Sequence, residues 1–321
     1  MILASGRAHA TGRHHVIALF GLGLIGSALQ HELRQRLIAA NDLLPFGWGP
    51  AAPFALQSAA IEHAVARQAT NLDIAGQQSL FDCVWCAGVG GFATPAETFE
   101  TERRAFGAVL DFARRLATRL PDSEHTFHLL SSAGGLFEGR RHVSGSTRPE
   151  PLRPYGRIKL EQEALTRDLP GRINTQIYRP TSVYGFAPRG RTGLVAALAG
   201  DAIRRRTTRI FGNPNTIRDY VFADDIARFI ADAVIYRAPS ATHLLASGKP
   251  TSVLEVVRHV EARMQRSLYV QFDTTPSNAR DMSVEHGSLP PSLRATPLQI
   301  GIATTADRVM RHMTGPAPSG G

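Results

Sequence analysis

Two residues four positions apart, Tyr155 and Lys159 in the stretch YGRIK, have types and a spacing suited to acid–base chemistry. The apolar pattern of residues 153–169 predicts a helix, and residues four apart project from one face of a helix. A neighbouring ammonium favours the ionised form of a tyrosine, so the pair could act as a general base near neutral pH. Of the 36 basic residues only Lys159 and Lys249 are lysines, which favours this role over an accidental surface pair.

Two serines could supply a catalytic hydroxyl. The stretch LLSSAGGLFEG, residues 129–139, places Ser131 and Ser132 where an apolar run ends and shortly before a pair of glycines. A plain turn that ends a strand is the alternative. The residue types alone leave open whether either serine takes part and, if so, which one.

A third stretch, IALFGLGLIGSAL, contains Gly21, Gly23 and Gly26 in the spacing GxGxxG. A strand-like run precedes it and a helical pattern follows it, and in that context the spacing indicates a dinucleotide site. The glycines let the backbone approach a pyrophosphate, which binds to the unpaired N–H groups of the helix N-terminus. A tight turn without a ligand is the alternative.

The only two cysteines, Cys83 and Cys86, are spaced as CxxC, a spacing found in metal and redox sites. They lie in FDCVWCAG, which we expect to be a buried strand, and on a strand residues three apart point to opposite faces. No second pair exists to complete four ligands. We therefore expect two structural cysteines and no metal.

The composition is that of a globular protein, with 43% hydrophobic and 20% charged residues among 321. The net charge of +9 comes from scattered arginines, so we expect an anionic small molecule as the partner and no nucleic acid. No apolar run is long enough for a transmembrane helix, and the N-terminus does not look like a signal peptide. We expect a cytoplasmic protein with no membrane partner.

Strand-like runs and helical patterns alternate along the chain. This alternation predicts an α/β fold with a doubly wound parallel sheet, covered by helices on both faces. After about residue 185 the pattern becomes irregular, which predicts a smaller C-terminal lobe. The predicted strands are 15–20, 81–88, 125–132 and 172–180, and the predicted helices are 26–40, 96–120, 153–169 and 251–266.

These residues, together with further segments, resemble the extended short-chain dehydrogenase/reductase family, in its nucleotide-sugar epimerase/dehydratase group. The resemblance covers about residues 15–310. FDCVWCAG is similar to the family strand D-x-V-x-x-x-A, and YRPTSVYG (178–185) is similar to R-P-x-N-V-Y-G. FGNPNTIRDYVFADDIAR (211–228) is similar to the segment that ends in R-D-F-V-x-V-D-D-V-A. ASGKPTSVLEVV (246–257) is similar to the loop and helix that follow that segment.

The resemblance implies a Rossmann domain that binds NAD, with NADP as the alternative, and a C-terminal α/β lobe that binds a nucleoside-diphosphate sugar. It also implies a homodimer formed through the helices near 96–118 and 153–168. We expect the Rossmann domain at 14–184 with 217–246 returning to it, the substrate lobe at 185–216 and 247–314, and disorder at 1–13 and 315–321.

The resemblance also implies roles for individual residues. Tyr155 would take the proton of a sugar hydroxyl while the nicotinamide takes hydride from the same carbon. Lys159 would favour the phenolate and bond the cofactor ribose. Asp73 matches an acid that bonds the adenine. The implied cofactor-binding residues are Gly21, Gly23, Leu24, Ile25, Gly26, Asp73, Cys86, Ala87, Gly88, Lys159, Arg179 and Pro180, and the implied substrate-binding residues are Ser131, Gly134, Ser182, Arg218 and Arg280.

Arg218 and Arg280 match arginines that contact the substrate diphosphate, a role that suits a bidentate guanidinium. For Arg218 the alternative is a surface ion pair with Asp219. The alignment at Arg280 is loose.

Four positions depart from the family pattern. Phe20 stands where the glycine loop often has a further glycine, and Ser182 replaces the asparagine of R-P-x-N. Glu102 or Thr101 stands where a helix asparagine is usual. The stretch after the second strand, LLPFGWGP (43–50), has neither the acid that binds the adenosine ribose nor an arginine.

The serines can be placed by counting along the family segment S-S-x-x-V-Y-G, which residues 129–139 resemble. Counting from the strand end favours Ser132 as the catalytic hydroxyl, near Tyr155, with Ser131 pointing away. Counting back from the aromatic residue of that segment reaches Ala133 instead, which implies a one-residue insertion in the glycine pair. Strand ends are the better anchors because loops absorb insertions. Ser131, or no serine, is the alternative.

The sequence also bears on the reaction. Dehydratases of the family follow the catalytic hydroxyl with an Asp-Glu pair, whereas this chain has Ala133, Gly134 and Gly135 there, so dehydration is disfavoured. We predict a nucleoside-diphosphate-sugar 4-epimerase that transfers hydride reversibly to tightly bound NAD through a 4-keto intermediate. A 4-ketoreductase using NAD(P)H needs the same groups, and a non-catalytic NAD(P)-binding sensor or scaffold has the same fold, so both remain alternatives.

Overall fold

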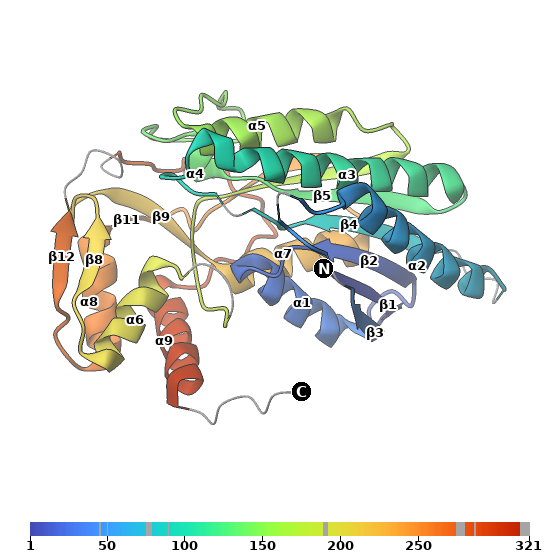
Figure 1. The fold of residues 1–321 in the computed structure, drawn as a ribbon. Coiled ribbons are helices and arrows are strands. Elements are labelled where there is room, and N and C mark those ends of the chain that lie inside the picture. The colour runs from blue at the N-terminus through green and yellow to red at the C-terminus, as the bar shows by residue number, and fades with distance from the viewer. Residues whose placement is uncertain are drawn as a thin grey trace.

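Seven strands form the main sheet in the described part of the chain, in the order β10-β6-β5-β4-β2-β1-β3 (Figure 1). Six of them run in one direction, and only β1 is antiparallel to its neighbours β2 and β3. The strands are β1 (Ile2–Ala8), β2 (His14–Phe20), β3 (Leu37–Leu43), β4 (Ser79–Trp85), β5 (Glu124–Leu130), β6 (Ile173–Pro180) and β10 (Ala241–Leu245). The predicted α/β doubly wound sheet is confirmed, with the addition of β1.

The structure is a computed structural model and describes residues 1–44, 46–49, 51–74, 79–88, 90–188, 192–273, 280–285 and 287–314, without the side chains of 38–43 and 69–74. The predicted disorder of 315–321 lies outside these residues. No helix in the described ranges is both long and apolar enough to cross a membrane.

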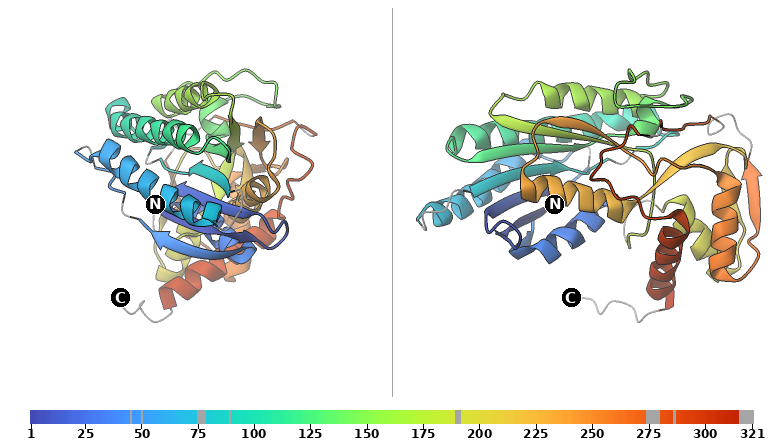
Figure 2. Two further views of the ribbon diagram at one scale, coloured as in Figure 1. Left: turned by 90° about the vertical axis from the view of Figure 1, so that its right-hand side faces the viewer. Right: turned by 180° about the vertical axis from the view of Figure 1, so that it is seen from behind.

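Helices cover both faces of the sheet (Figures 1 and 2). Strand β2 shows why: Ile17 and Leu19 pack into the cluster with α1 and α7, while Val16 and Phe20 pack into the cluster with α2 and α3. A strand buried on both faces has the continuous apolar run seen in the sequence. The helices are α1 (Leu24–Arg36), α2 (Phe54–Ile74), α3 (Phe99–Arg119, after a 3₁₀ turn at Ala96–Thr98), α4 (Ala133–Leu136), α5 (Pro154–Arg167) and α7 (Ala223–Tyr236).

The N-terminal residues correct the expectation of disorder at 1–13. Residues 2–8 form β1, which pairs with β2 on one side and with β3 on the other. Ile2, Leu3 and Ala4 are buried, so the strand is stabilised by apolar packing as well as by its ladders. The hairpin closes through the N–H of Ala8, which donates to the carbonyl of Arg13. The local pattern did not show the strand, and one of its two partners, β3, lies well beyond it in the chain.

Helix α1 ends earlier than expected. The predicted helix 26–40 stops at Arg36, and residues 37–40 begin β3 instead. Pairing with β1 extends over the whole of β3, from Leu37 to Leu43. A tertiary ladder therefore overrides the helical pattern of these residues.

A smaller lobe lies at one end of the main sheet (Figures 1 and 2). It contains a three-stranded sheet, a two-stranded sheet and three helices, packed around Val195, Leu198, Phe222, Val256 and Ile302. Its elements are β7 (Ser182–Tyr184), α6 (Leu194–Arg204), β8 (Thr208–Phe211), β9 (Ile217–Phe222), β11 (Pro250–Ser252), α8 (Val253–Met264), β12 (Val270–Asp273) and α9 (Leu298–Thr314).

Asp82, the aspartate of the segment D-x-V-x-x-x-A, is held by ion pairs in the core. Asp82 is buried under the sheet, where it accepts hydrogen bonds from Arg237 (2.6 Å) and pairs with His128 (3.0 Å) and His15 (3.5 Å). Burial acts to raise the pKa of the Asp82 carboxyl, but the charge of Arg237 and the bonds from the two histidines outweigh it and hold the pKa well below its usual range. The buried charge is thus compensated within the core.

Candidate functional site

The glycine loop between β2 and α1 uses its three glycines for different purposes. Gly21 has φ +90° and touches the next loop so closely that a Cβ would lie 2.5 Å from the backbone nitrogen of Ala87. A Cβ on Gly26 would lie 1.9 Å from the carbonyl oxygen of Gly21. A Cβ on Gly23 would meet nothing within 4 Å. Gly21 and Gly26 are therefore required by packing, and Gly23 leaves open space above the loop.

That open space is part of a cavity of about 720 Å³ at the carboxyl ends of the strands. Residues from the glycine loop, from the ends of β4, β5 and β6, from β7 and from α5 line it together. Those predicted from the sequence are Gly23, Leu24, Ile25, Cys86, Gly88, Ser131, Ser132, Gly134, Tyr155, Pro180 and Ser182.

Part of the lining was not predicted from the sequence. The unpredicted residues are Gly90, Gly91, Phe92, Leu130, Thr181, Val183, Thr192 and Gly193. Gly193 is the N-cap of α6 and has no side chain capping the helix, so the first N–H groups of α6 lie at the cavity. The glycine directly before the apolar helical run LVAALAG was the signal that could have identified this end.

Two glycines position Tyr155. A Cβ on Gly135 in α4 would lie 3.0 Å from the Tyr155 ring, and a Cβ on Gly156 would lie 2.1 Å from the carbonyl oxygen of Gly135. The backbones of α4 and α5 therefore touch, and the ring lies across the contact. The edge of Phe92 packs against the same ring, with centroids 5.9 Å apart. Gly135 of the stretch LLSSAGGLFEG thus makes room for the tyrosine ring.

Lys159 lies one helical turn after Tyr155, with its ammonium 5.9 Å from the centre of the Tyr155 ring. The ammonium is buried and donates to Glu102 Oε1 (3.1 Å) and Gln162 Oε1 (3.0 Å). It lies behind Gly88, where a Cβ would be 3.3 Å from Nζ. The tyrosine and the lysine therefore share one face of α5, as the spacing predicts.

The two serines make different contacts. Ser132 is the N-cap of α4, and its Oγ accepts from the N–H of Gly135 at 3.1 Å. Ser131 donates its hydroxyl to Glu163 at 2.7 Å. Both serines line the cavity, but only Ser131 is engaged by a buried carboxylate.

Glu163 is the centre of a buried ion-pair cluster. Arg179 donates to both of its oxygens, at 2.8 and 2.6 Å. Burial acts to raise the pKa of Glu163, and the hydrogen bonds and charge of Arg179 outweigh it, so the pKa is lowered. The guanidinium of Arg179, which the resemblance placed at the cofactor, is thus held by Glu163 and does not line the cavity.

Other predicted residues also lie away from the lining. Gly21, Gly26 and Ala87 lie under the loop, where they pack against one another or against its helix. Asp73 belongs to the last turn of α2, and its side chain lies outside the described residues.

The two arginines predicted for the diphosphate lie next to each other. Arg218 in β9 donates to the carbonyl of Arg280, and burial lowers the pKa of its guanidinium. Asp219 faces elsewhere: it accepts from the N–H groups of Ser247 (2.7 Å) and Gly248 (2.8 Å) and from Thr181 (3.2 Å). These contacts give Asp219 a structural role, because its carboxylate holds the loop at residues 247–248 against β9. Neither arginine lines the cavity that contains Tyr155.

The nearest acid after the serines is Glu138, and it is not free. Arg153 donates to both of its oxygens at 2.7 Å, and the Glu138 side chain is buried. A carboxylate held in this way is poorly placed to protonate a leaving hydroxyl. The contact supports the expectation that the site is not built for dehydration.

Phe20 and the two cysteines, which the sequence singled out, also have defined places. Phe20 packs into the core against Phe46 and Phe112, so this departure leaves the glycine loop open. Cys83 points into one core cluster, while Cys86 packs against the other and lines the cavity. Burial raises the pKa of the Cys86 thiol to about 12 and that of Cys83 well above its usual value. In the described ranges no group of three or more His, Cys, Asp or Glu side chains is placed to hold a metal ion.

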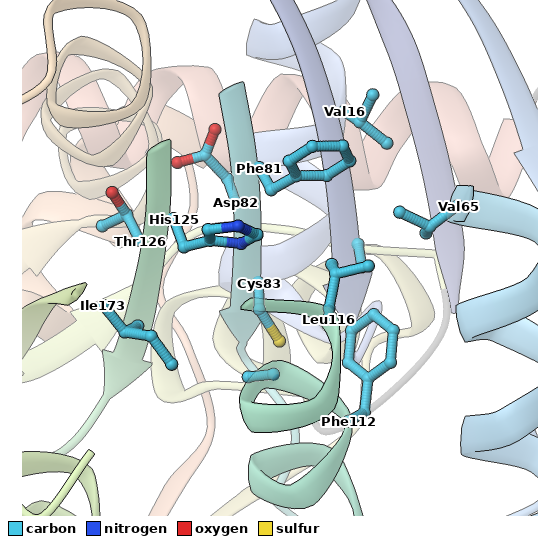
Figure 3. A pocket seen from close by; sticks show the side chains of 12 residues that line it. Val16, Val65, Phe81, Asp82, Cys83, Phe112, Leu116, His125, Thr126 and Ile173 are labelled. Carbon is cyan, nitrogen blue, oxygen red and sulfur yellow. The ribbon is translucent and has the colours of Figure 1, made fainter. Parts of the chain in front are cut away.

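A second hollow, of about 20 Å³, lies inside the core and shares no residue with the large cavity (Figure 3). Figure 3 shows Val16, Val65, Phe112 and Leu116 around it. Its size suits at most a single water molecule. It is a small gap in the packing between the sheet and α2 and α3.

The residues present fit a dinucleotide. Gly23 offers the close backbone approach that a pyrophosphate needs, and α1 begins there without a capping side chain, so its N–H groups remain available. The same cavity contains Tyr155 from α5. Fold and site together define a Rossmann protein of the extended short-chain dehydrogenase/reductase type.

Residues 19–240 match the NAD dependent epimerase/dehydratase family, and the chain belongs to that family. This confirms the resemblance drawn from the motifs. Among curated relatives, 123 residues are 33% identical to the dTDP-L-rhamnose 4-epimerase of Burkholderia thailandensis, covering 36% of this chain and 34% of the relative. A further match is 45% identical over 123 residues to the UDP-glucose 4-epimerase of Mycolicibacterium smegmatis, covering 34% of this chain and 37% of the relative. The matches thus span little more than a third of these relatives.

The fold is also similar to that of solved epimerases. The UDP-glucose 4-epimerase from Brucella ovis, in complex with NAD, superimposes with a TM-score of 0.72 at 17% identity, over 92% of this chain and 98% of that one. At this identity the likeness establishes the fold.

Proposed function

We propose that the protein is a nucleoside-diphosphate-sugar 4-epimerase that works with tightly bound NAD. The observation that carries the proposal is that Tyr155, Ser132 and the glycine loop line one cavity, with Lys159 directly behind it. The family is named for its dependence on NAD. The relatives named above act on nucleotide sugars at C4, and their names support the same substrate class here.

In the proposed mechanism Tyr155, as the phenolate, takes the proton of the sugar C4 hydroxyl. NAD, held at the glycine loop by Gly23 and the N-terminus of α1, would supply the redox chemistry at C4. The Lys159 ammonium favours the phenolate by its charge. Ser132 donates its hydroxyl to the C4 oxygen and holds it in place. After the 4-keto sugar has rotated in the cavity so that its other face is presented, Tyr155 returns the proton to the C4 oxygen.

The substrate would extend from the reacting carbon towards the smaller lobe. The open end of α6 at Gly193 offers N–H groups to a phosphate. Arg218 and Arg280 lie further out, and we propose that they contact the diphosphate once it is bound. Accordingly, residues 185–216 and 247–314 would form the substrate lobe, and 14–184 with 217–246 the cofactor domain.

The test is turnover of a panel of nucleoside-diphosphate sugars by the purified protein and by the Tyr155→Phe variant. We expect 4-epimerisation without net consumption of NAD, and a loss of at least about 10³-fold in kcat in the variant, which retains bound NAD. Stoichiometric consumption of NAD(P)H would instead identify a 4-ketoreductase. A protein that retains NAD but converts no sugar would overturn the proposal and leave a sensor or scaffold.

Two further parts of the proposal concern the protein in the cell. We propose a cytoplasmic protein, which suits two cysteines that are both unpaired. We also propose a homodimer through α3 and α5. Because α3 turns charged residues such as Arg103 and Arg104 outward, ion pairs would contribute much of that contact. Cell fractionation and sedimentation velocity test the two statements separately.

A further inference from the structure

A buried carboxylate stands beside the lysine of the site. Glu102 in α3 and Lys159 in α5 are 5% and 4% exposed, and their oxygen and nitrogen lie 3.1 Å apart. Glu102 is one of the two residues, with Thr101, that stand where the family pattern has an asparagine. At the point where the ammonium is held, the chain therefore carries a negative charge.

The contact is part of a closed triangle. Glu102 Oε1 accepts from Lys159 Nζ and from Gln162 Nε2 (2.9 Å), and Gln162 Oε1 accepts from Lys159 Nζ (3.0 Å). The three side chains join α3 to α5. Hydrogen bonds to two acceptors leave the buried ammonium little freedom to move, so the triangle fixes its position behind Gly88.

The second oxygen of Glu102 is buried and has no hydrogen-bond partner. It faces the thin wall of the cavity, where a Cβ on Gly88 would lie 3.6 Å from it. A buried carboxylate oxygen without a partner is costly.

The other ionisable groups around the site are neutral or paired. The Cys86 thiol faces Lys159, and its raised pKa of about 12 keeps it neutral. Beyond Phe92, Arg153 is paired with Glu138. In the cluster that holds Ser131, Glu163 is paired with Arg179. Among these described groups, Glu102 is the carboxylate in direct contact with Lys159, beside Tyr155.

We propose that Glu102 is a positioning residue that fixes Lys159 and sets the pH range in which Tyr155 acts as a base. The ammonium favours the phenolate, and the carboxylate opposes that effect in part. This inference rests on the proposed function, since it assigns Tyr155 the role of the base.

The size of the effect follows from the distances. The ammonium is 5.9 Å from the Tyr155 ring centre and 3.1 Å from Glu102 Oε1, which places that oxygen within about 9 Å of the ring. At such a separation, with the effective dielectric constant of about 20 that suits protein sites, one charge displaces a titration by about one pH unit.

The first experiment compares the pH profile of kcat in the protein and in Glu102→Gln, which keeps the shape and removes the charge. Loss of the negative charge favours the phenolate, so we expect the acid limb to move about one pH unit lower. The matched control is Glu100→Gln on the same helix, whose side chain is 66% exposed; its limb should stay in place because solvent screens the charge. A limb that does not move in Glu102→Gln, or that moves to higher pH, overturns the proposal.

The second variant, Glu102→Asp, separates charge from packing. It keeps the negative charge but is shorter, so the acid limb should stay within about 0.3 pH unit while kcat falls about tenfold as Lys159 loses its fixed position. A limb displaced as far as in Glu102→Gln would show that packing, not charge, sets the profile, and would also overturn the proposal.

A third measurement does not depend on turnover. Ultraviolet difference absorbance follows phenolate formation, and subtracting the Tyr155→Phe titration isolates the signal of Tyr155. The Tyr155 titration should move to lower pH in Glu102→Gln by the same amount as the acid limb. If the protein converts no sugar, the proposed function fails, yet this titration still decides whether Glu102 opposes the phenolate.

Discussion

The two sides of the glycine loop are built in different ways. At the ends of β4, β5 and β6, side chains converge on one cavity and are held by buried contacts, such as the triangle around Lys159 and the glycine contact under Tyr155. On the other side, β1 lies between β2 and β3, so two strand spacings, about 9.5 Å, separate β3 from the strand that precedes the loop.

The difference matters because a Rossmann protein binds the adenosine ribose with an acid that follows the strand next to the loop strand. Here β1 occupies the place next to β2, and residues 44–49, which follow β3, are LPFGWG and carry no charge. The reacting end of the cleft therefore resembles the family closely, and the adenosine end does not. We expect recognition of the cofactor to depend mainly on the loop and on the reacting end.

The largest effect should come from the reacting end, in a comparison of Ser132→Ala with Ser131→Ala. Ser132 faces the cavity without a carboxylate partner, so its loss should lower kcat about 100-fold. Ser131 supports Glu163, so its loss should cost about 1 kcal/mol of unfolding free energy and leave kcat within about threefold. Steady-state kinetics measure kcat, and urea unfolding measures the stability of both variants. If kcat falls in Ser131→Ala and not in Ser132→Ala, Ser131 supplies the catalytic hydroxyl.

A smaller effect tests the loop itself, through Gly23→Ala and Gly26→Ala. Gly23 has φ −74° and open space around it, so alanine should leave stability within about 0.5 kcal/mol but weaken NAD binding about tenfold, because the methyl group blocks the pyrophosphate. Alanine at Gly26 collides with a backbone oxygen and should destabilise the fold by about 3 kcal/mol. Calorimetric titration and thermal unfolding separate the two. Unchanged NAD affinity in Gly23→Ala would mean that the cofactor lies elsewhere.

The smallest effect tests the adenosine end. Discrimination between NAD and NADP needs a charged group near the ribose, and residues 44–49 supply none. We expect the dissociation constants of NAD and NADP, measured by calorimetry on the cofactor-free protein, to agree within about tenfold. A difference of about 10³-fold between the two dissociation constants would show that a charged residue outside this stretch binds the ribose. The adenosine end would then be as specific as the reacting end.

The reacting end was predictable because its signals are local. Tyr155 and Lys159 share a face of one helix, and the glycine spacing lies between a strand and a helix, as predicted. The same applies to the strand end that carries Ser131 and Ser132, since β5 stops at Leu130. In each case periodicity within about fifteen residues contained the information.

The adenosine end was not predictable in this way, because its structure depends on distant partners. Residues 2–8 pair with β2 and with β3, and the helix predicted for residues 26–40 extends over the first four residues of β3. Glu102 presented a related difficulty. The sequence showed that Glu102 or Thr101 departs from the family asparagine. It could not show the contact of Glu102 with Lys159, because the two residues are 57 positions apart.

The strand inserted beside β2 also has a consequence for the order in which the protein folds. Strands β1 and β2 are joined by a short turn, closed by Gly12 at φ +66°, and form a local antiparallel hairpin. Such hairpins form in microseconds, whereas the parallel pairing of β2 with β4 must first close a loop of about sixty residues. The hairpin could serve as the template on which the parallel strands assemble, so proline at Ala4 should slow refolding more than proline in the late strand β10.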